Sequence, residues 1–421
     1  MRGGLGNDSY VVDSMLDTVT ENAGEGTDTV TASTHYRMTA NVENLALQGD
    51  ATTPLQGYGN ALANHLTGSA GTNLLNGLGG ADTMAGGLGN DVYFADDALD
   101  FVVENNGEGN DAVFSTVDYT LTANVETLVL QGVAGLKGTG NNLDNAIYGN
   151  SGRNTLDGGT GFDALFGGAG DDIYYVNGGD GVIENPGEGR DTVIASINYA
   201  LSTNVENLVL QGDTATSLQG YGNDLVNFLT GSDGANLLNG LGGADVMVGG
   251  LGNDVYFVDD PGDQVIENPG EGTDAIFSTV SRMLEPNVET LVLQGTGNLS
   301  GDGNLFANKL YGNAGNNVLN GQSGADMLNG GAGHDTLIGG AGNDTFVFAA
   351  GQADGDIVVD FDDGGPFAAA DTLQFVGYGA GATFTQNDAA HWQVNFNGGA
   401  SHEVITFQNL PSIQPFDVLF V

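Results

Sequence analysis

Apolar side chains recur along this chain at fixed steps, separated by short stretches rich in glycine. Leu75, Met84 and Tyr93, for example, stand nine positions apart. The six residues before each such triplet contain up to three glycines, which accept positive φ at little cost and so favour tight turns. The three residues x–apolar–x then predict a short strand whose middle side chain faces inward. We therefore expect an all-β chain of short strands joined by glycine turns.

The same sequence motif recurs along the chain at nearly equal intervals. It begins as GGLGNDSYVVD at Gly3, GGLGNDVYFAD at Gly86, GGAGDDIYYVN at Gly167 and GGLGNDVYFVD at Gly249, so each copy starts just over eighty positions after the last. Self-similarity at a fixed period indicates a repeat architecture, in which each repeat buries its apolar face against the next. We expect about 4.3 such repeats, which occupy residues 1–349.

Within each repeat the pattern is G-G-x-G-x-D-x-U-x, where U is apolar. Two nonapeptides make one flattened coil of turn, strand, turn and strand, so residues i and i+18 stack about 4.8 Å apart. Asp82 is then expected over Asn64, and Asp91 over Asn73. A looser x-G-x-G-x-D turn follows, and its Asp111 stands at i+20 from Asp91. We expect each repeat to contain four coils, some of them longer than two nonapeptides.

Composition narrows the function. The chain has 421 residues, of which 72 are glycine; 54 are acidic and only 7 are Lys or Arg, so the formal net charge is −47. This balance excludes a nucleic-acid binder, which needs basic groups to neutralise phosphates. Cysteine is absent, so disulfides and thiolate metal sites are excluded, and no apolar run approaches the ~18 residues of a membrane helix. Membrane insertion is not expected, whereas carboxylates and carbonyls suit calcium.

The nonapeptide resembles that of the RTX, or hemolysin-type calcium-binding, proteins, over roughly residues 1–349. The resemblance implies a right-handed parallel β-roll or β-solenoid, with several Ca²⁺ ions bound between successive turns. It also implies an extracellular protein exported by type I secretion with an uncleaved C-terminal signal. No enzymatic activity is expected of the repeats.

Calcium takes 6–8 oxygen ligands, more than one Asp supplies, but two stacked turns offer two carboxylates and several backbone carbonyls. The candidate metal ligands are therefore the aspartates of the motif turns. They are Asp8, Asp28, Asp82, Asp91, Asp111, Asp163, Asp172, Asp191, Asp245, Asp254, Asp274, Asp326, Asp335, Asp344 and Asp362, the last expected to stack at i+18 from Asp344. Asp356, Asp360 and Asp371 either close the last metal site or are ordinary turn acids.

The first two rows of each repeat carry Asn in place of Asp. These residues are Asn64, Asn73, Asn145, Asn154, Asn227, Asn236, Asn308 and Asn317. An amide supplies an oxygen without charge, so these rows either bind metal weakly or form a metal-free amide ladder, as stacked β structures do. We favour the amide ladder where two Asn rows face each other, and we expect weak metal occupancy where an Asn row faces an Asp row.

Electrostatics suggests that calcium drives folding. Two carboxylates about 5 Å apart repel by about 3 kcal/mol at an effective dielectric of 20. A site with a dissociation constant of about 10⁻⁴ M gains about 1.4 kcal/mol at about 1 mM calcium and almost nothing at cytosolic levels. We therefore expect a chain that is exported unfolded and folds in external calcium.

Residues 350–421 lack the nonapeptide and carry alternating apolar runs such as HWQVNF and EVITFQNL. These runs predict short antiparallel strands that form a C-terminal capping β domain. The segment also resembles the region that closes RTX rolls, and its acidic and apolar end, PFDVLFV, resembles a type I secretion signal.

No catalytic motif was found. HExxH is absent, the five histidines form no i,i+4 pair, and no glycine motif carries a P-loop lysine. Glu43, Glu126, Glu206 and Glu289, in the recurrent NVEN or NVET, are expected to hydrogen-bond a turn rather than to act as acids or bases.

Three functions remain open. The first is a secreted structural protein that assembles head to tail into a filament or surface layer, because the first turn exposes an open edge. The second is the carrier portion of a larger toxin, hydrolase or adhesin. The third is a polysaccharide-binding module.

Overall fold

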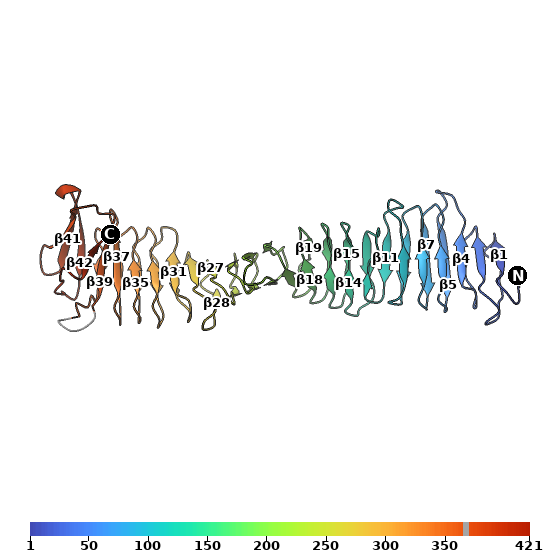
Figure 1. Cartoon of the computed structure of the whole chain (residues 1–421), viewed down its shortest axis with the longest axis horizontal. Helices are drawn as coiled ribbons and strands as arrows, with labels where there is room; N and C mark the ends of the chain where they lie inside the picture. The colour runs from blue at the N-terminus through green and yellow to red at the C-terminus, as the bar shows by residue number, and fades with distance from the viewer. Residues whose placement is uncertain (365–369) are drawn as a thin grey trace. The chain divides into compact units, whose positions relative to one another are not determined.

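The computed structural model describes residues 1–364 and 370–421; residues 365–369, part of the predicted cap, lie outside the described residues. The described chain is built almost entirely of short strands, labelled in Figure 1, with the short 3₁₀ helix η2 (Asn397–Gly399) near its end. Contacts divide it into two compact units: Met1–Ile197 with Ser202–Asn207, and Asn198–Leu201 with Leu208–Val421.

In the first unit, consecutive strands alternate between two faces. One face begins with β1 (Ser9–Val12), β2 (Thr29–Ala32), β4 (Asn44–Leu47), β6 (His65–Thr67), β8 (Thr83–Ala85) and β10 (Phe101–Val103). It continues as a new sheet with β12 (Tyr119–Thr120), β14 (Lys137–Thr139), β16 (Thr155–Asp157), β18 (Ile173–Val176) and β20 (Thr192–Ala195). The other face carries β3 (Tyr36–Arg37), β5 (Leu55–Asn60), β7 (Asn73–Leu78), β9 (Val92–Ala95), β11 (Ala112–Ser115), β13 (Thr127–Leu130), β15 (Ala146–Tyr148), β17 (Ala164–Phe166) and β19 (Gly181–Ile183).

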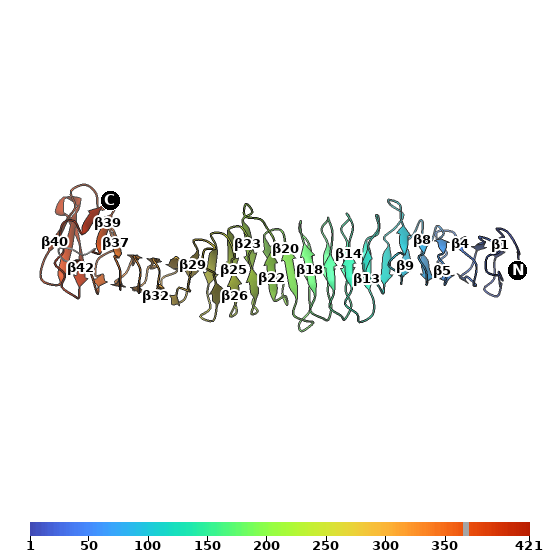
Figure 2. The same ribbon diagram turned by 60° about the horizontal axis from the view of Figure 1, so that its bottom comes forward.

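The second unit is built in the same way (Figure 2). One face carries β22 (Asn207–Leu210), β24 (Phe228–Thr230), β26 (Val246–Val248) and β28 (Gln264–Ile266), and then β30 (Arg282–Met283), β32 (Ser300–Asp302), β34 (Val318–Asn320), β36 (Thr336–Ile338) and β38 (Ile357–Val358). The other carries β21 (Tyr199–Ala200), β23 (Leu218–Tyr221), β25 (Asn236–Asn239), β27 (Val255–Val258), β29 (Ala275–Ser278), β31 (Thr290–Leu293), β33 (Lys309–Tyr311), β35 (Met327–Asn329), β37 (Thr345–Ala349), β39 (Thr372–Val376) and β43 (Val418–Phe420).

The pairing is parallel throughout the coils, which confirms the predicted parallel β-solenoid. Residue pairs lie one coil apart: Leu74 pairs with Val92, and Val92 pairs in turn with Ala112. The inward side chain of each strand stacks on its neighbours in a buried core, as predicted for Leu75, Met84 and Tyr93, which are 0% exposed. Fully burying one such side chain contributes about 1.5–3 kcal/mol, so the core is a sum of many equal steps.

The expected four coils per repeat were an undercount. The repeat that starts with β5 contains nine strands, β5 to β13, and the next repeat starts with β14. Since each coil has two strands, nine strands make four and a half coils. The additional half coil fits into the repeat because the coil from Ala112 to its partner Thr127 is shorter than two nonapeptides. That coil has an NVET turn in place of a GxGxD turn, so the search for the nine-residue motif did not detect it. An odd number of strands also places equivalent residues of successive repeats on opposite faces.

The solenoid pairing continues beyond the last nonapeptide. Strands β38, β39 and β43 add to the ladders in parallel. The antiparallel strands predicted for the cap are β40 (Thr383–Gln386), β41 (His391–Phe396) and β42 (Ser401–Phe407), and β42 joins the solenoid by pairing in parallel with β38. The cap is therefore a hydrogen-bonded extension of the last coils.

Candidate metal centres

The aspartates predicted to stack do so in columns along the turns. In each column the backbone N–H of one residue donates to the Oδ1 of the residue one coil later. Asn73 donates to Asp91 at 2.6 Å, Asp91 to Asp111 at 2.7 Å, and Asn145 to Asp163 at 2.7 Å. The expected stacking of Asp82 on Asn64 is confirmed by the same contact at 2.7 Å. These hydrogen bonds use one carboxylate oxygen and fix the direction of the other.

In ten of the fifteen predicted aspartates, the second oxygen is buried and has no hydrogen-bond donor among the described residues. They are Asp8, Asp82, Asp91, Asp163, Asp172, Asp245, Asp254, Asp326, Asp335 and Asp344. A buried carboxylate oxygen without a partner is costly, so each of these oxygens marks a place suited to a cation. Four other predicted aspartates, Asp28, Asp111, Asp191 and Asp274, stand one coil later in the same columns.

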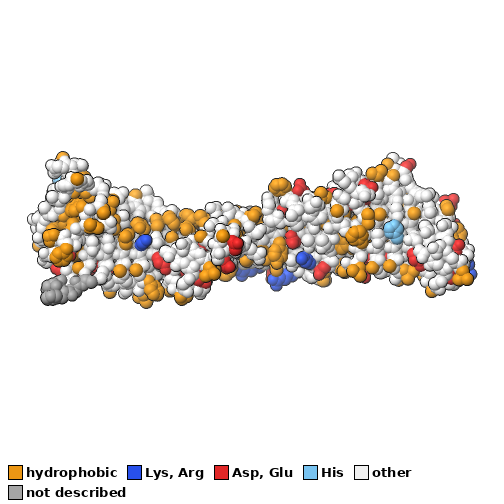
Figure 3. Space-filling model, viewed as in Figure 1, with side chains coloured by type: hydrophobic (Ala, Val, Ile, Leu, Met, Phe, Trp, Pro, Cys, Tyr) orange, Lys and Arg blue, Asp and Glu red, His pale blue; other side chains and the backbone are white. Residues whose placement is uncertain are grey.

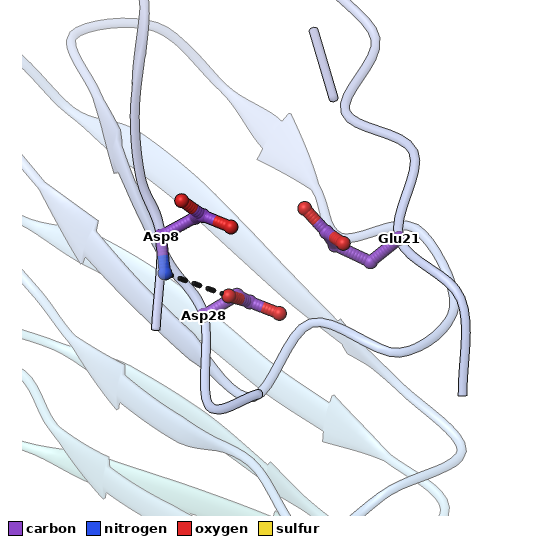
Figure 4. A group of neighbouring side chains, drawn as sticks. All are labelled: Asp8, Glu21 and Asp28. Carbon is purple, nitrogen blue, oxygen red and sulfur yellow. Dashed lines mark hydrogen bonds between the residues drawn. The ribbon is translucent and has the colours of Figure 1, made fainter. Parts of the chain in front are cut away.

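The structure brings three carboxylates together once in each of four repeats, in what we call the Asp–Glu–Asp centres. They are Asp8–Glu21–Asp28, Asp91–Glu104–Asp111, Asp172–Glu184–Asp191 and Asp254–Glu267–Asp274, and in each the ligand atoms lie within 4.8 Å of one another. Figure 4 shows the first centre, where the three carboxylates converge and the Asp8 N–H donates to Asp28 Oδ1 at 2.8 Å. Two adjacent turns, one coil apart, supply all three groups.

The glutamates of these centres were missed by the sequence interpretation. Glu104 stands at i+18 from Gly86, so it replaces the first glycine of the next turn, in the recurrent text ENxGEGxD. At Gly86 itself no side chain fits, because a Cβ there would lie 2.1 Å from Asp91 Oδ2 and 2.3 Å from the Tyr93 hydroxyl. The recurrence of Glu21, Glu104, Glu184 and Glu267 at the repeat step was the signal that could have identified them.

A tyrosine accompanies each of these glutamates. At the apolar position U the four turns carry Tyr10, Tyr93, Tyr174 and Tyr256. Tyr93, which is 0% exposed, donates its hydroxyl proton to Glu104 Oε1 and accepts the N–H of Gly86 at 2.7 Å. Tyr174 and Tyr256 donate to Glu184 and Glu267 in the same way. In these three centres the tyrosine holds one glutamate oxygen, whereas in the first centre Glu21 Oε1 accepts the N–H of Gly3 at 3.2 Å. In all four centres Oε2 of the glutamate is buried without a donor among the described residues.

The three carboxylates of a centre are difficult to ionise together. Burial, added to the charges of the neighbouring carboxylates, raises the pKa of Asp91 to about 7, that of Glu104 to about 8 and that of Asp111 to about 6. Backbone N–H groups partly oppose the shift at the two aspartates, and the Tyr93 hydroxyl opposes it at Glu104. Raised pKa values in one cluster indicate a place where negative charge is concentrated and a cation is favoured.

Residues of the NVEN and NVET motifs, in the next coil, form hydrogen bonds to these centres. Asn124, at φ +67°, donates its side-chain N–H to the Glu104 carbonyl at 2.9 Å. Glu126 Oε2 accepts the backbone N–H of Asp111 at 2.8 Å. The same pair of contacts recurs at the other three centres, made by Asn41 and Glu43, Asn204 and Glu206, and Asn287 and Glu289. The predicted turn-bonding role of these glutamates is therefore confirmed.

The asparagine rows are satisfied by hydrogen bonds. Asn64 Oδ1 accepts the N–H of Asn60 at 2.7 Å, and its Nδ2 donates to the Val42 carbonyl of the preceding coil at 3.1 Å. Asn145 repeats both contacts with Asn141 and Val125. Each of these two asparagines stacks on an aspartate, as the i+18 step predicts, so no Asn-on-Asn ladder forms there. The amide is bonded to backbone, which supports a metal-free role for these rows.

The column position expected for Asp362 is occupied by Asp371. Asp344 donates its N–H to Asp371 Oδ1 at 2.7 Å, and Asp362 donates its own to Asp371 Oδ2 at 2.7 Å. The coil from Asp344 to Asp371 is longer than two nonapeptides. The expected i+18 step from Asp344 therefore reaches Asp362, which stands before the residue that stacks on Asp344. Asp356 takes the equivalent position for Asp335, and Asp360 accepts the N–H groups of Gly339 and Gly340.

Three of the remaining predicted aspartates are each paired with a second aspartate one coil later. Asp82 stacks on Asp100, Asp163 on Asp180 and Asp245 on Asp263. These second members also went unpredicted, because their turns lack the glycine pattern; only their spacing of about one coil could have identified them. In each of these three pairs the first aspartate alone retains an unpaired oxygen, so these pairs are poorer in ligands than the Asp–Glu–Asp centres. Asp326 stacks on Asp344 in the same way, and there both aspartates retain a buried oxygen without a donor among the described residues.

The donors of an Asp–Glu–Asp centre fit calcium. All three side-chain donors are carboxylates, which suit a hard cation such as calcium, whereas softer metals prefer imidazole or thiolate. A bound ion would supply the positive charge that the buried, unpaired oxygens lack. Within the chain's own residues, the hydrogen bonds of the column hold the carboxylates in place.

The family comparison agrees with this chemistry, and two further similarities were found. The family described as RTX calcium-binding nonapeptide repeat matches residues 58–93, 148–183, 221–256, 302–337 and 320–352. A stretch of 70 residues is 41% identical to the endo-1,3-1,4-beta-glycanase ExsH of Rhizobium meliloti (strain 1021), and the match spans 17% of this chain and 15% of that enzyme. The crystal structure of extracellular lipase LipA from Serratia marcescens aligns at 18% identity with a TM-score of 0.24, over 55% of this chain and 45% of the lipase. No helix among the described residues is both long and apolar enough to cross a membrane.

Proposed function

Since this chain belongs to the proteins built from RTX calcium-binding nonapeptide repeats, we propose that it is an extracellular structural scaffold whose β-roll folds on external calcium. The observation that carries the proposal is the recurrence of a buried Asp–Glu–Asp centre in four repeats. In this proposal the roll binds ions and is not an enzyme.

Buried charge supplies the coupling between calcium and folding. Each centre gathers three carboxylates, and in the second, third and fourth centres burial disfavours the ionised form of all three. An ion that binds the folded roll and not the unfolded chain stabilises by RT ln(1 + [Ca²⁺]/Kd), so four centres act together at millimolar calcium and hardly at cytosolic levels. Such a chain remains unfolded during export, which suits type I secretion by the C-terminal segment.

Circular dichroism of the full chain tests the proposal. In excess EGTA at pH 7.5 we expect the spectrum of a largely unfolded chain, and in about 5 mM calcium, about 50 times a Kd of 10⁻⁴ M, a β spectrum. Magnesium at the same concentration is the control, because its smaller shell demands octahedral geometry and leaves the roll unfolded. Equal β content in EGTA and in calcium would refute the proposal.

A second candidate is that the roll is the carrier portion of a hydrolase. The similarity to a glycanase over 70 residues favours it, and the match spans only 15% of that enzyme. An in-frame catalytic domain in the coding sequence upstream of Met1 would support this candidate. Fibres in electron micrographs taken in millimolar calcium would instead favour end-to-end assembly into a filament or surface layer.

A further inference from the structure

Three of the four Asp–Glu–Asp centres contain a hydrogen bond that the first centre lacks. In each of these three a tyrosine hydroxyl donates to the glutamate, as Tyr93 does to Glu104 Oε1. In the first centre the equivalent hydroxyl, that of Tyr10, is buried without a partner among the described residues, and Glu21 accepts the N–H of Gly3 instead. The chain therefore contains its own comparison between a glutamate held by a tyrosine and one that is not.

The direction of the tyrosine proton is fixed in the second centre. The N–H of Gly86 donates to the Tyr93 oxygen at 2.7 Å, so this oxygen is the acceptor there and its proton points to Glu104 Oε1. A hydrogen bond from a hydroxyl to a carboxylate is stronger than one between neutral groups. Oε1 is thus occupied, and Oε2, which has no donor among the described residues, is the oxygen left for an ion.

The core fixes the position of the tyrosine ring. Tyr93 pairs with Leu75 on one neighbouring strand and with Val113 on the other, and all three side chains are 0% exposed. The tyrosines of the third and fourth centres are likewise paired on both sides. Tyr10 lies on β1, the outermost described strand of its sheet, and pairs on one side only. Because a close-packed core restricts movement, the hydroxyl is held where it meets the glutamate.

We propose that Tyr93, Tyr174 and Tyr256 are positioning residues that fix their glutamates as calcium ligands, so that these three centres bind calcium more tightly than the first. The proposal rests on the proposed function, in which the centres bind calcium. A carboxylate that is already held in place loses less conformational freedom when the ion binds. Groups that orient a metal ligand through a hydrogen bond typically change metal affinity by about 10–100-fold.

Burial makes the tyrosine hydroxyl difficult to replace by water. Although the chain has 54 acidic residues, the surface in Figure 3 shows acidic side chains only in small separate groups. Glu104 is 7% exposed, and Asp91 and Asp111 are each 1% exposed. Without the hydroxyl, Glu104 Oε1 would lose its donor in a place with little access to solvent, and a buried polar atom without a partner is costly.

A double-mutant cycle at the second centre tests this role, with calcium binding to the full chain measured by titration calorimetry. Tyr93→Phe keeps the ring and removes only the hydroxyl, so it is expected to weaken one site by about tenfold or more. Added to Glu104→Ala, the same substitution is expected to change the affinity by less than about twofold, because its effect passes through the glutamate. The matched control is Tyr10→Phe, which removes an unpartnered hydroxyl at the same motif position and should leave calcium binding unchanged.

Circular dichroism in calcium verifies the fold of each variant, and Tyr174→Phe with Glu184→Ala repeats the cycle at the third centre should Glu104→Ala fail to fold. Unchanged calcium binding by Tyr93→Phe would overturn the proposal. An equal loss with and without the glutamate would also overturn it, since the tyrosine would then act through packing alone, and so would an equal loss in Tyr10→Phe.

The proposed function and this proposal fail in different ways. Wild type that folds in EGTA would contradict calcium-driven folding, and the ratio of affinities between Tyr93→Phe and wild type would still decide the role of the tyrosine. Wild type that binds no calcium would overturn both.

Discussion

One glutamate in each repeat distinguishes four turns from all the other acidic turns of this chain. Glu104 replaces a turn glycine, lies 7% exposed, and shares its two oxygens between the Tyr93 hydroxyl and the space between Asp91 and Asp111. Aspartates also occur in motif turns that have no such glutamate, for example Asp82 and Asp335. A third carboxylate is what turns a pair of stacked aspartates into a set of ligands for calcium.

Removing the charge of this glutamate is expected to remove one strong site. In Glu104→Gln the size is kept, and calorimetric titration of the full chain with calcium should show one of the four strongest sites weakened by at least tenfold, about 1.4 kcal/mol. Glu108→Gln is the control, because Glu108 lies in the same turn and bonds Asn105 instead of a centre. An unchanged titration of Glu104→Gln would exclude this glutamate as a ligand.

Neighbouring aspartates offer a second matched pair. Asp172 is 1% exposed and belongs to a centre, whereas Asp171 is exposed and accepts the N–H of Arg190. We expect Asp172→Asn to raise the calcium concentration at half folding several-fold, and Asp171→Asn to leave it within experimental error. Equal shifts in the two variants would mean that only net charge matters, and not the centre.

Low pH is expected to promote folding of the roll even without calcium, because protonation removes part of the carboxylate charge. Burial raises the pKa of Asp91, Asp172 and Asp254 to about 7 in the folded roll, well above the ordinary value of about 4 in an unfolded chain. A raised folded pKa favours folding below the unfolded pKa, and this stability is lost as the pH rises through about 7. In EGTA, β content should therefore increase as the pH falls from 8 to 5. A decrease over that range would contradict the assigned burial.

At the scale of the element, the turn glycines matter where two coils approach closely. Gly86 faces the Asp91 carboxylate and the Tyr93 hydroxyl, both within 2.3 Å of the position that a Cβ would take. Gly79, in a neighbouring turn, has no atom within 4 Å of that position. Both glycines belong to motif turns, and only the stacked structure shows which of them is crowded.

Alanine at these two glycines should therefore have different effects. Gly86→Ala forces the carboxylate or the ring to move and is expected to destabilise the calcium-bound roll by about 1–3 kcal/mol and to weaken calcium binding. Gly79→Ala should be within about 0.5 kcal/mol of wild type. Urea unfolding in millimolar calcium measures both, and a neutral Gly86→Ala would contradict the close approach.

The turns that carry asparagine at the motif's aspartate position lend themselves to the opposite substitution, from amide to carboxylate. Asn64→Asp removes the Nδ2 donation to the Val42 carbonyl and adds a buried charge, so we expect lower stability by about 2 kcal/mol and no additional calcium site. Asn76→Asp, which changes an outward-facing strand residue, is the control and should change stability little. A gain of a calcium site in Asn64→Asp would show that these rows are latent metal sites.

Across the whole molecule, the sequence predicted the architecture well because a solenoid is governed by local periodicity. The period of nine placed Leu75, Met84 and Tyr93 in the core and Asp82 over Asn64, and both were confirmed. It failed where a coil departs from two nonapeptides: the short coil after Ala112 was not counted, and Asp371 took the place expected for Asp362. The glutamates were missed because each replaces a glycine that the motif treats as fixed.

The most direct test of the account is an anomalous-difference map of the calcium-bound crystal. The account predicts a calcium peak within each Asp–Glu–Asp centre, bounded by Glu21, Glu104, Glu184 and Glu267, and no peak at the amide of Asn64 or Asn145. Well-ordered centres without ions in millimolar calcium, with the aspartate columns intact, would contradict it.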